Sequence, residues 1–457
     1  MKRTVELAIP WQVQRTNWVF AFILLFGLCL GNVHAQSLSV GVLDAYQLAL
    51  TKDQKFQLVK AQSQADMEVL PQARARLLPA VTFSVARGRV NQERDDNNTL
   101  LLKQNYNTQQ EVLIVKQPVY SPRLTRAESQ AQALVRASQA AVDLERLGLL
   151  GRVTEAYLNA VLANERVAHV ARQVDNAKTR LKAAELALVS GTGTRTDILD
   201  IHAEIDLASA QLIQARQTVH ITEGELASLM GLPAVNVKVV RAFNLQSELS
   251  IAKNLETLKA DVFNTHPELL QREYQKQAAE YALQAAQAEH YPAADLSLQK
   301  SRSIGDSGFF ANTQITAQSV GVQVSVPIYQ GGLIDSKVRQ ALASLQESEF
   351  RIGEAKQRLE NEFRKAYFSV KETQSRWAAL QTAMDSANLT VIANQRSAQV
   401  GVRSQLDVVL AEQRLTQVQL QLAEARIQAI MAWVKVMTWA SADQTPVLQQ
   451  LSLWFEP

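Results

Sequence analysis

Two short glycine-containing breaks carry the most regularly spaced polar residues of this sequence. Gly191 is followed six positions later by Asp197, and Gly401 is followed six positions later by Asp407. An aspartate near the start of a helix accepts hydrogen bonds from the free N–H groups of the first turn. Arg403, four positions before Asp407, places a positive charge near these carboxylates. The pattern predicts charged, capped turns between helices.

The rest of the sequence offers no arrangement typical of catalysis. It has no glycine-rich phosphate loop and no Ser-His-Asp order. His169, His202 and His220 do not have the i, i+4 spacing of two zinc ligands on one helix face. The single cysteine, Cys29, lies in an apolar N-terminal stretch. We therefore expect no enzyme, no cofactor and no metal site.

Composition and charge exclude two further classes of protein. The chain has 457 residues, of which 47% are apolar and 20% are charged, so it can bury a large core and is not intrinsically disordered. Its formal net charge is only +3. This balance gives no electrostatic basis for binding nucleic acid.

The first residues are typical of an export signal. Lys2, Arg3 and Arg15 precede the apolar stretch Trp18–Leu30, which is shorter than the roughly 20 residues of a membrane-spanning helix. Val33-His34-Ala35 then resembles a cleavage site. We predict a signal peptide over residues 1–35, with an uncleaved membrane anchor as the alternative. The mature chain would contain no cysteine.

The remaining chain reads as a tandem duplication. Three proline- or glycine-marked motifs recur at offsets of 213, 209 and 210 positions: 76–81 with 289–294, 117–120 with 326–329, and the two breaks at Gly191 and Gly401. We predict a first repeat over 36–233, a linker over 234–252, a second repeat over 253–440 and a C-terminal tail over 441–457. Each repeat is too long for a solenoid unit.

Long helical hairpins dominate both repeats. Two proline-free runs, 123–232 and 328–445, are rich in strong helix formers and are interrupted at the glycine breaks. We expect helices over 123–189 and 196–230, and again over 333–399 and 404–439. Shorter helices are expected over 54–78, with a kink at Pro71, and over 267–291.

These lengths constrain the architecture. In each repeat the two shorter helices, stacked end to end, nearly match the long helix in length. The pattern therefore predicts a long helical cylinder rather than a globule. Gly148 and Gly151 lie within the first long helix, where glycine is unfavourable, and predict a close helix–helix approach or, alternatively, a hinge.

Alternating segments predict two strands in each repeat. Val320, Val322 and Val324 alternate with small or polar residues, as do residues 81–86 and 295–299, and 111–120 is a weaker candidate. The polar segments 91–110 and 304–316 are expected to be hairpin loops. The alternation suits either a soluble sheet with one wet face or a lipid-facing barrel. Because four strands cannot close a barrel, the second reading requires several chains.

The ordered set of features resembles the TolC family of outer-membrane exit ducts. It comprises the duplicated halves, the two G-x5-D tips, His266-Pro267-Glu268-Leu269 at the opening of the second helical region, Leu78-Pro79 and Pro118-Val119-Tyr120. The resemblance covers about residues 40–440. It implies a mostly α fold with a membrane β-barrel, in which a homotrimer forms a twelve-stranded barrel and a twelve-helix periplasmic tunnel.

The resemblance also implies the function and the partners. The protein would be a passive duct for efflux or type I secretion, located in the outer membrane and in contact with its lipid. A periplasmic adaptor would bind the tips around 189–200 and 399–410. An inner-membrane pump, such as an ABC or a proton-driven transporter, would supply the energy.

The same resemblance implies an iris-like gate at the tips. By position, Thr196 and Asp197 match residues that link neighbouring hairpins, Arg403 matches the arginine of the second hairpin, and Asp407 matches the first of two ring aspartates. Helix capping is the alternative role of these aspartates.

Two positions depart from the pattern of the family. Leu410 stands where the second ring aspartate is expected, and Ala398 stands where a linking tyrosine is expected. Asp200, in the first hairpin, offers a carboxylate that could replace the missing layer.

An alternative function remains open at this stage. A periplasmic coiled-coil adaptor or structural scaffold would also have a signal peptide and helical hairpins. It would leave the duplicated alternating strands without a role.

Overall fold

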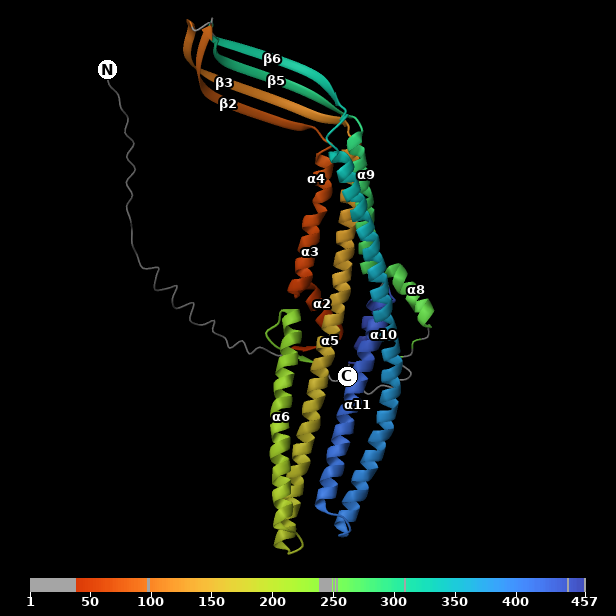
Figure 1. The fold of residues 1–457 in the computed structure, drawn as a ribbon. Coiled ribbons are helices and arrows are strands. Elements are labelled where there is room, and N and C mark those ends of the chain that lie inside the picture. Colours follow the sequence, from red (N-terminus) through yellow and green to blue (C-terminus); the bar gives the residue numbers. More distant parts are fainter. Residues whose placement is uncertain are drawn as a thin grey trace, which may run out of the picture.

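The computed structural model describes residues 38–96, 99–237, 249, 251, 254–307, 310–441 and 444–455. The predicted signal peptide, residues 1–35, lies outside these described residues. The molecule is elongated, with a β-sheet at one end and the tips of two helical hairpins at the other (Figure 1).

Two hairpins of unequal helices form most of the length. The first pairs α5 (Pro122–Val189) with α6 (Arg195–Met230), and the second pairs α10 (Leu333–Gln399) with α11 (Gln405–Trp439). The 68 residues of α5 span about 100 Å at 1.5 Å per residue. Pro122 begins α5, where the missing N–H removes no helical bond, and Gly231 ends α6 in the left-handed region. These helices confirm the predicted hairpins.

Shorter helices extend both hairpins toward the sheet. α3 (Gln54–Met67) and α4 (Val69–Ala75) pack on α5, and α9 (Pro267–Gln287), followed by the 3₁₀ turn η1 (Ala288–His290), packs between α5 and α10. The shorter helices therefore follow one another along the long ones, as expected (Figure 1). The helix expected over 54–78 is two helices, because Pro71 cannot bond to the carbonyl of Met67 and its ring crowds that group.

A four-stranded antiparallel sheet lies at the far end from the tips. Its order is β2 (Ala80–Asp96), β3 (Thr99–Tyr120), β5 (Ala293–Ser307) and β6 (Phe310–Ser325). The prediction of loops over 91–110 and 304–316 is wrong, since β2 and β3 remain paired to Asp96 and Thr99, and β5 and β6 to Ser307 and Phe310. Polar residues do not end a strand when a neighbouring strand satisfies its backbone.

One face of the sheet is apolar close to the helices. Val81, Val115, Leu298 and Val320 lie opposite one another in a row across all four strands. Directly opposed residues share a face, so the alternation in separate strands becomes one surface. The side chains of Val81 and Val320 are 66% and 73% exposed. The neighbouring rows on this face add Phe83, Leu113, Leu296 and Val322.

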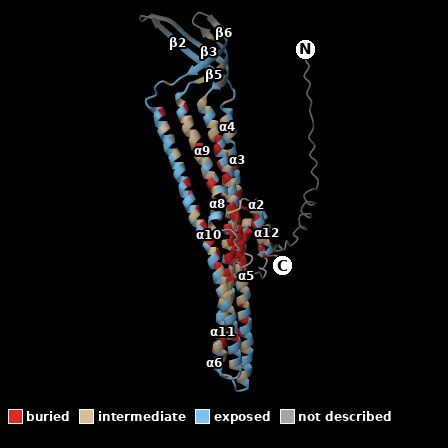
Figure 2. Ribbon diagram, turned by 90° about the vertical axis from the view of Figure 1, so that its right-hand side faces the viewer, coloured by how far each residue is buried: buried red, intermediate tan, exposed pale blue. Residues whose placement is uncertain are grey.

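The hydrophobic core is concentrated at the middle of the long helices (Figure 2). There, β1 (Leu38–Val40) pairs in parallel with β4 (Val235–Val237). Buried side chains of α2 (Val42–Lys52), α8 (Leu255–Thr265) and α12 (Thr445–Leu453) belong to the same core. The largest side chains with almost no exposed surface include Tyr157, Phe363, Trp433 and Phe455. None of the described helices is both long and apolar enough to cross a membrane.

Candidate functional site at the hairpin tips

The turn between α5 and α6 is built by a left-handed glycine and a capping box. Gly191 has φ +74°, and the N–H of Thr192 donates to the carbonyl of Ala187 at 2.9 Å, which satisfies a free carbonyl at the end of α5. The N–H of Asp197 then donates to Thr194 Oγ1 at 3.2 Å. In return, the carboxylate of Asp197 accepts from the N–H of Thr194 at 3.1 Å.

The turn between α10 and α11 repeats this geometry. Gly401 has φ +75°, and the N–H of Val402 donates to the carbonyl of Ser397 at 2.9 Å. Asp407 forms a capping box with Ser404, with its N–H 3.2 Å from Ser404 Oγ. Hydrogen bonds from Ser404 hold the pKa of Asp407 below its ordinary value, and the nearby charge of Arg403 lowers it further. The predicted capping role is therefore confirmed for Asp197 and Asp407.

The other predicted gate residues lie on the surface of the tips. Thr196, Asp200 and Arg403 are exposed. Among the described residues, no hydrogen bond or ion pair joins any of these three to the other hairpin. Within one chain the predicted gate residues therefore fall into two separate groups, one at each tip.

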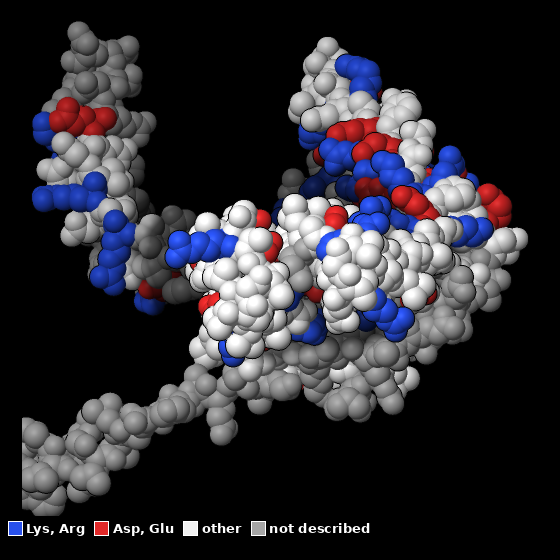
Figure 3. All heavy atoms as spheres, turned by 90° about the horizontal axis from the view of Figure 1, so that it is seen from below, with Lys and Arg blue, Asp and Glu red and all other residues white. Residues whose placement is uncertain are grey.

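Apolar side chains are exposed beside these polar groups. Viewed from the tip end, both hairpin ends present mostly uncharged residues with scattered charges (Figure 3). Leu410, at the position of the missing aspartate, is 54% exposed. The other exposed large apolar residues at the tips are Leu186, Val189, Leu199, Val400, Val402 and Leu406.

A charged cluster above the tips, absent from the sequence prediction, joins the two hairpins. Arg180 Nη2, on α5, donates to both carboxylate oxygens of Glu204 on α6, at 2.7 and 2.8 Å. The same nitrogen lies 3.4 Å from Glu412 Oε2 on α11. Glu412 also accepts from Gln395 Nε2 at 3.0 Å. With Gln395 of α10 the cluster connects four helices, and Glu204 is only 6% exposed.

One signal in the sequence could have indicated half of this cluster. Arg180 and Glu204 are equally distant in sequence from Thr192, so an antiparallel hairpin turning there places them at one height. Glu412 could not be found in this way, because its contact depends on how α11 packs against α5. Farther from the tips, Arg426 of α11 pairs with Glu165 of α5. His169 Nδ1 lies 3.1 Å from Gln419 Oε1.

Comparison with known proteins identifies the family to which this architecture belongs. The family model described as outer membrane efflux protein matches residues 45–232 and 261–440. The chain belongs to the outer membrane efflux protein family. The match confirms the predicted family and outer-membrane location, and with them a channel for efflux or type I secretion rather than an enzyme. It leaves the alternative of a periplasmic scaffold without support.

Individual relatives agree with this membership. The alkaline protease secretion protein AprF of Pseudomonas aeruginosa is 27% identical over 91% of this chain and 87% of its own length. The outer membrane protein TolC of Escherichia coli is 23% identical over 88% of this chain and 82% of its own. A solved structure of CusC superposes with a TM-score of 0.77 at 16% identity, covering 89% of this chain and 93% of that one. The fold is thus mostly helical, with long helices and a four-stranded antiparallel sheet.

Proposed function

We propose that three copies of the chain assemble into an outer-membrane exit duct, with a twelve-stranded barrel and a twelve-helix tunnel. The open four-stranded sheet carries this proposal. In the described part of the chain, its outer strands, β2 and β6, each pair along one edge only. Unpaired edges are not tolerated in lipid, whereas the apolar row of Val81, Val115, Leu298 and Val320 is suited to contact with it.

The helices support the same assembly. Within one chain α5 and α11 pack against each other, and α6 and α10 lie on the outer sides of the two hairpins (Figure 1). Both outer helices expose large apolar side chains: Leu207 and Ile213 on α6 are 67% and 70% exposed, and Leu389 on α10 is 67% exposed. A head-to-tail contact of α6 with the α10 of a neighbouring copy would bury both faces and close a ring.

We place the gate of this duct at the tips, where Thr196, Asp197, Asp200, Arg403 and Asp407 lie. The capping boxes hold the carboxylates of Asp197 and Asp407 at fixed positions on the helix starts. Arg403 is exposed, and among the described residues it has no partner on the other hairpin of its own chain, so it can meet the first hairpin of a neighbour. Opposite charges across that contact would hold the tips closed.

The partners and the cargo follow from the surface and from the relatives. The exposed apolar residues of the tips suit the docking of a periplasmic adaptor, through which an inner-membrane ABC or proton-driven pump would act. AprF is named for the secretion of alkaline protease. We therefore favour a secreted protein over a small molecule as cargo.

Single-channel recording in a planar bilayer tests the duct and its gate. The purified protein should give small, stable currents, and Arg403→Ala should raise the closed-state conductance. Asp407→Asn removes the charge while its side-chain oxygen can still accept from Ser404, and should also raise it. Ser404→Ala, which weakens the cap and leaves both charges, is the matched control. A protein that is folded but gives no current in any of these forms would overturn the duct.

Export in cells tests the cargo. The gene would be expressed in cells that lack their own outlet but contain a type I pump, its adaptor and a substrate protease. Restored protease export supports the proposal. Restored drug resistance without protease export would show that the cargo is small molecules instead.

A further inference from the structure

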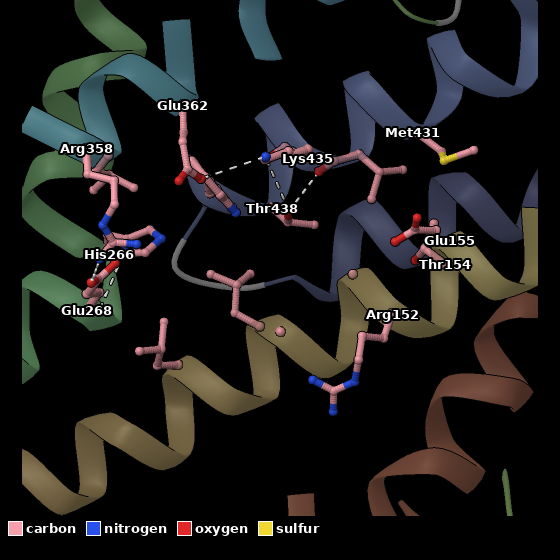
Figure 4. Close-up of a pocket in the computed structure, with 17 residues that line it drawn as sticks. Arg152, Thr154, Glu155, His266, Glu268, Arg358, Glu362, Met431, Lys435 and Thr438 are labelled. Carbon is pink, nitrogen blue, oxygen red and sulfur yellow. Dashed lines mark hydrogen bonds and ion pairs between the residues drawn. The ribbon is translucent and has the colours of Figure 1, made fainter. Parts of the chain in front are cut away.

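A pocket of about 550 Å³ lies where α9 begins and α11 ends (Figure 4). Its walls come from α5, α9, α10 and α11 of a single chain. It is distant from the hairpin tips, so it does not depend on the gate proposed above. Its apolar lining includes Leu147, Leu359, Met431, Val434 and Trp439. A volume of this size is within the range of small-molecule sites.

Two glycines of α5 help to form the pocket. Gly148 and Gly151 both line it, although glycine within a helix costs about 1 kcal/mol relative to alanine. A Cβ built on Gly151 would meet no atom within 4 Å, and one on Gly148 would meet only Arg152 Nη1 at 3.6 Å and Glu145 Oε2 at 4.0 Å. Among the described residues, the expected close approach of another helix to these glycines is thus absent. The missing side chains instead leave space open beside α5.

A buried hydrogen-bond donor faces this space. His266 is only 4% exposed, and its Nδ1 accepts from the N–H of Glu268 at 3.3 Å, which caps α9. The ring proton therefore sits on Nε2, which has no hydrogen-bond partner among the described residues. In Figure 4 the ring projects from the start of α9 toward the space facing α5 and α11. An unpaired buried donor costs about 1–3 kcal/mol, which a ligand oxygen would offset.

A second unpaired polar group lines the same pocket. Thr154 is 3% exposed, and its Oγ1 also lacks a partner among the described residues. Burial, together with the charge of Arg358, lowers the pKa of His266 to about 4, so the imidazole is neutral at ordinary pH. A neutral Nε2–H and a hydroxyl recognise an oxygen acceptor without requiring it to be charged.

Every positively charged side chain that lines the pocket lies beside a carboxylate. Arg358 pairs with Glu268, and Lys435 lies 4.0 Å from Glu362 and 4.8 Å from the ring centre of Trp439. Arg152 likewise pairs with Asp53 and Glu145, so an anionic ligand would find no free cation here. Glu155, which also lines the pocket and has no partner among the described residues, would repel an anion. Together with the donor of His266, this lining suits an uncharged acceptor rather than an anion.

We propose that this pocket binds an uncharged, largely apolar molecule whose carbonyl oxygen accepts a hydrogen bond from His266 Nε2. Aromatic amides and esters belong to this class. Leu147, Leu359 and Trp439 would contact the apolar body, and Thr154 would supply a second polar contact. The site would be present once in each chain of the assembled protein.

Equilibrium dialysis of the full mature protein in lipid nanodiscs tests the site. The probe is 2-naphthamide, compared with 2-naphthoate, which is charged, and with naphthalene, which has no acceptor. We expect saturable binding of the amide with one site per chain, at least tenfold tighter than either comparison compound. Absence of saturable binding would overturn the site, and tighter binding of the acid would overturn the ligand class.

Two variants locate the binding. Gly151→Leu fills the pocket without meeting a neighbour at Cβ and should weaken amide binding at least tenfold. Gly353→Leu, on α10, is the matched control, because it also replaces a helical glycine with open space around it but lies outside the pocket. His266→Asn keeps a capping acceptor and removes the Nε2 donor, so it should abolish the preference for the amide over naphthalene. Unchanged amide binding in Gly151→Leu would refute the assignment.

Discussion

Replacing Arg180 should loosen the attachment between the two hairpins. The side chain of Arg180 is 16% exposed, and those of its partners Glu204 and Glu412 are 6% and 18% exposed. In Arg180→Met the apolar stem is retained, but two carboxylates lie close together without their cation. Removing one partner of a buried ion pair costs about 3–5 kcal/mol, because the remaining charge is left uncompensated.

Amide hydrogen exchange measures this change where it occurs. A loss of about 3 kcal/mol in the free energy of local opening corresponds to roughly a 100-fold increase in exchange rate. We expect this increase in α6 around Glu204 and in α11 around Glu412, and little change in α9. Arg216→Met, an exposed position on α6, is the control and should leave exchange unaltered.

A second variant separates the charge effect from lost packing. Arg180→Met combined with Glu204→Gln removes both the cation and the most deeply buried carboxylate. It should recover at least half of the lost protection. If Arg180→Met exchanged within threefold of wild type at both segments, the cluster would not hold the hairpins together, and the reasoning would be refuted.

Three further predictions concern other regions. The pKa of His266 is lowered to about 4 in the folded protein, so the contribution of this residue to the free energy of unfolding is complete above pH 6.5 and falls by roughly 3 kcal/mol as the pH drops toward 4. Denaturant unfolding of His266→Asn should show a smaller loss of stability between these two pH values. Gly401→Ala places a side chain on a residue with φ +75° and should destabilise the tip by about 1 kcal/mol, whereas Gly353→Ala should stabilise α10. Limited proteolysis at the tips and thermal unfolding distinguish the two variants, and equal effects of both would contradict the argument. Val320→Lys on the apolar face should cost about 2–4 kcal/mol in lipid and reduce the amount of assembled protein in the membrane, while Ser319→Lys on the other face should be tolerated; equal losses would exclude lipid contact at Val320.

The long helices could be predicted from the sequence because their ends are set by local chemistry. Pro122, Gly191, Gly231 and Gly401 each act through their own backbone, and the structure begins or ends a helix within a few residues of every one. The kink expected at Pro71 became a full break for an equally local reason.

Features that depend on tertiary contact were missed. The strands continue through polar residues because a neighbouring strand pairs with them, and the segment 91–110 shows no apolar alternation by which to detect this. The parallel pairing of Leu38–Val40 with Val235–Val237 joins segments almost 200 positions apart. The tail proved to contain α12, whose neighbours Trp454 and Phe455 complete the central core against Trp433 and Tyr157.

In the candidate site, too, the local features could be predicted from the sequence and the tertiary contacts could not. The capping roles of Asp197 and Asp407 follow from their distance to a glycine, and the structure confirms them. The contacts proposed to make these residues a gate would lie between chains, so neither the sequence pattern nor a single chain tests them. Arg180 was not predicted, because its role in joining the two hairpins depends on α11, which the sequence does not position beside α5.

Two joints between the shorter helices lie at the level of the central core. A Cβ on Gly231, at the end of α6, would lie 3.1 Å from Lys52, just before α3 begins, and Trp439, at the end of α11, stacks edge-on against His266 at the start of α9, with ring centres 5.4 Å apart. Among the described helices, only α5 and α10 cross this level as continuous rods. A continuous helix transmits torque along its covalent backbone, whereas two abutting helix ends can rotate about each other. A twist applied at the tips of a chain would therefore reach the sheet mainly through α5 and α10, and α5 crosses this level at Gly148 and Gly151.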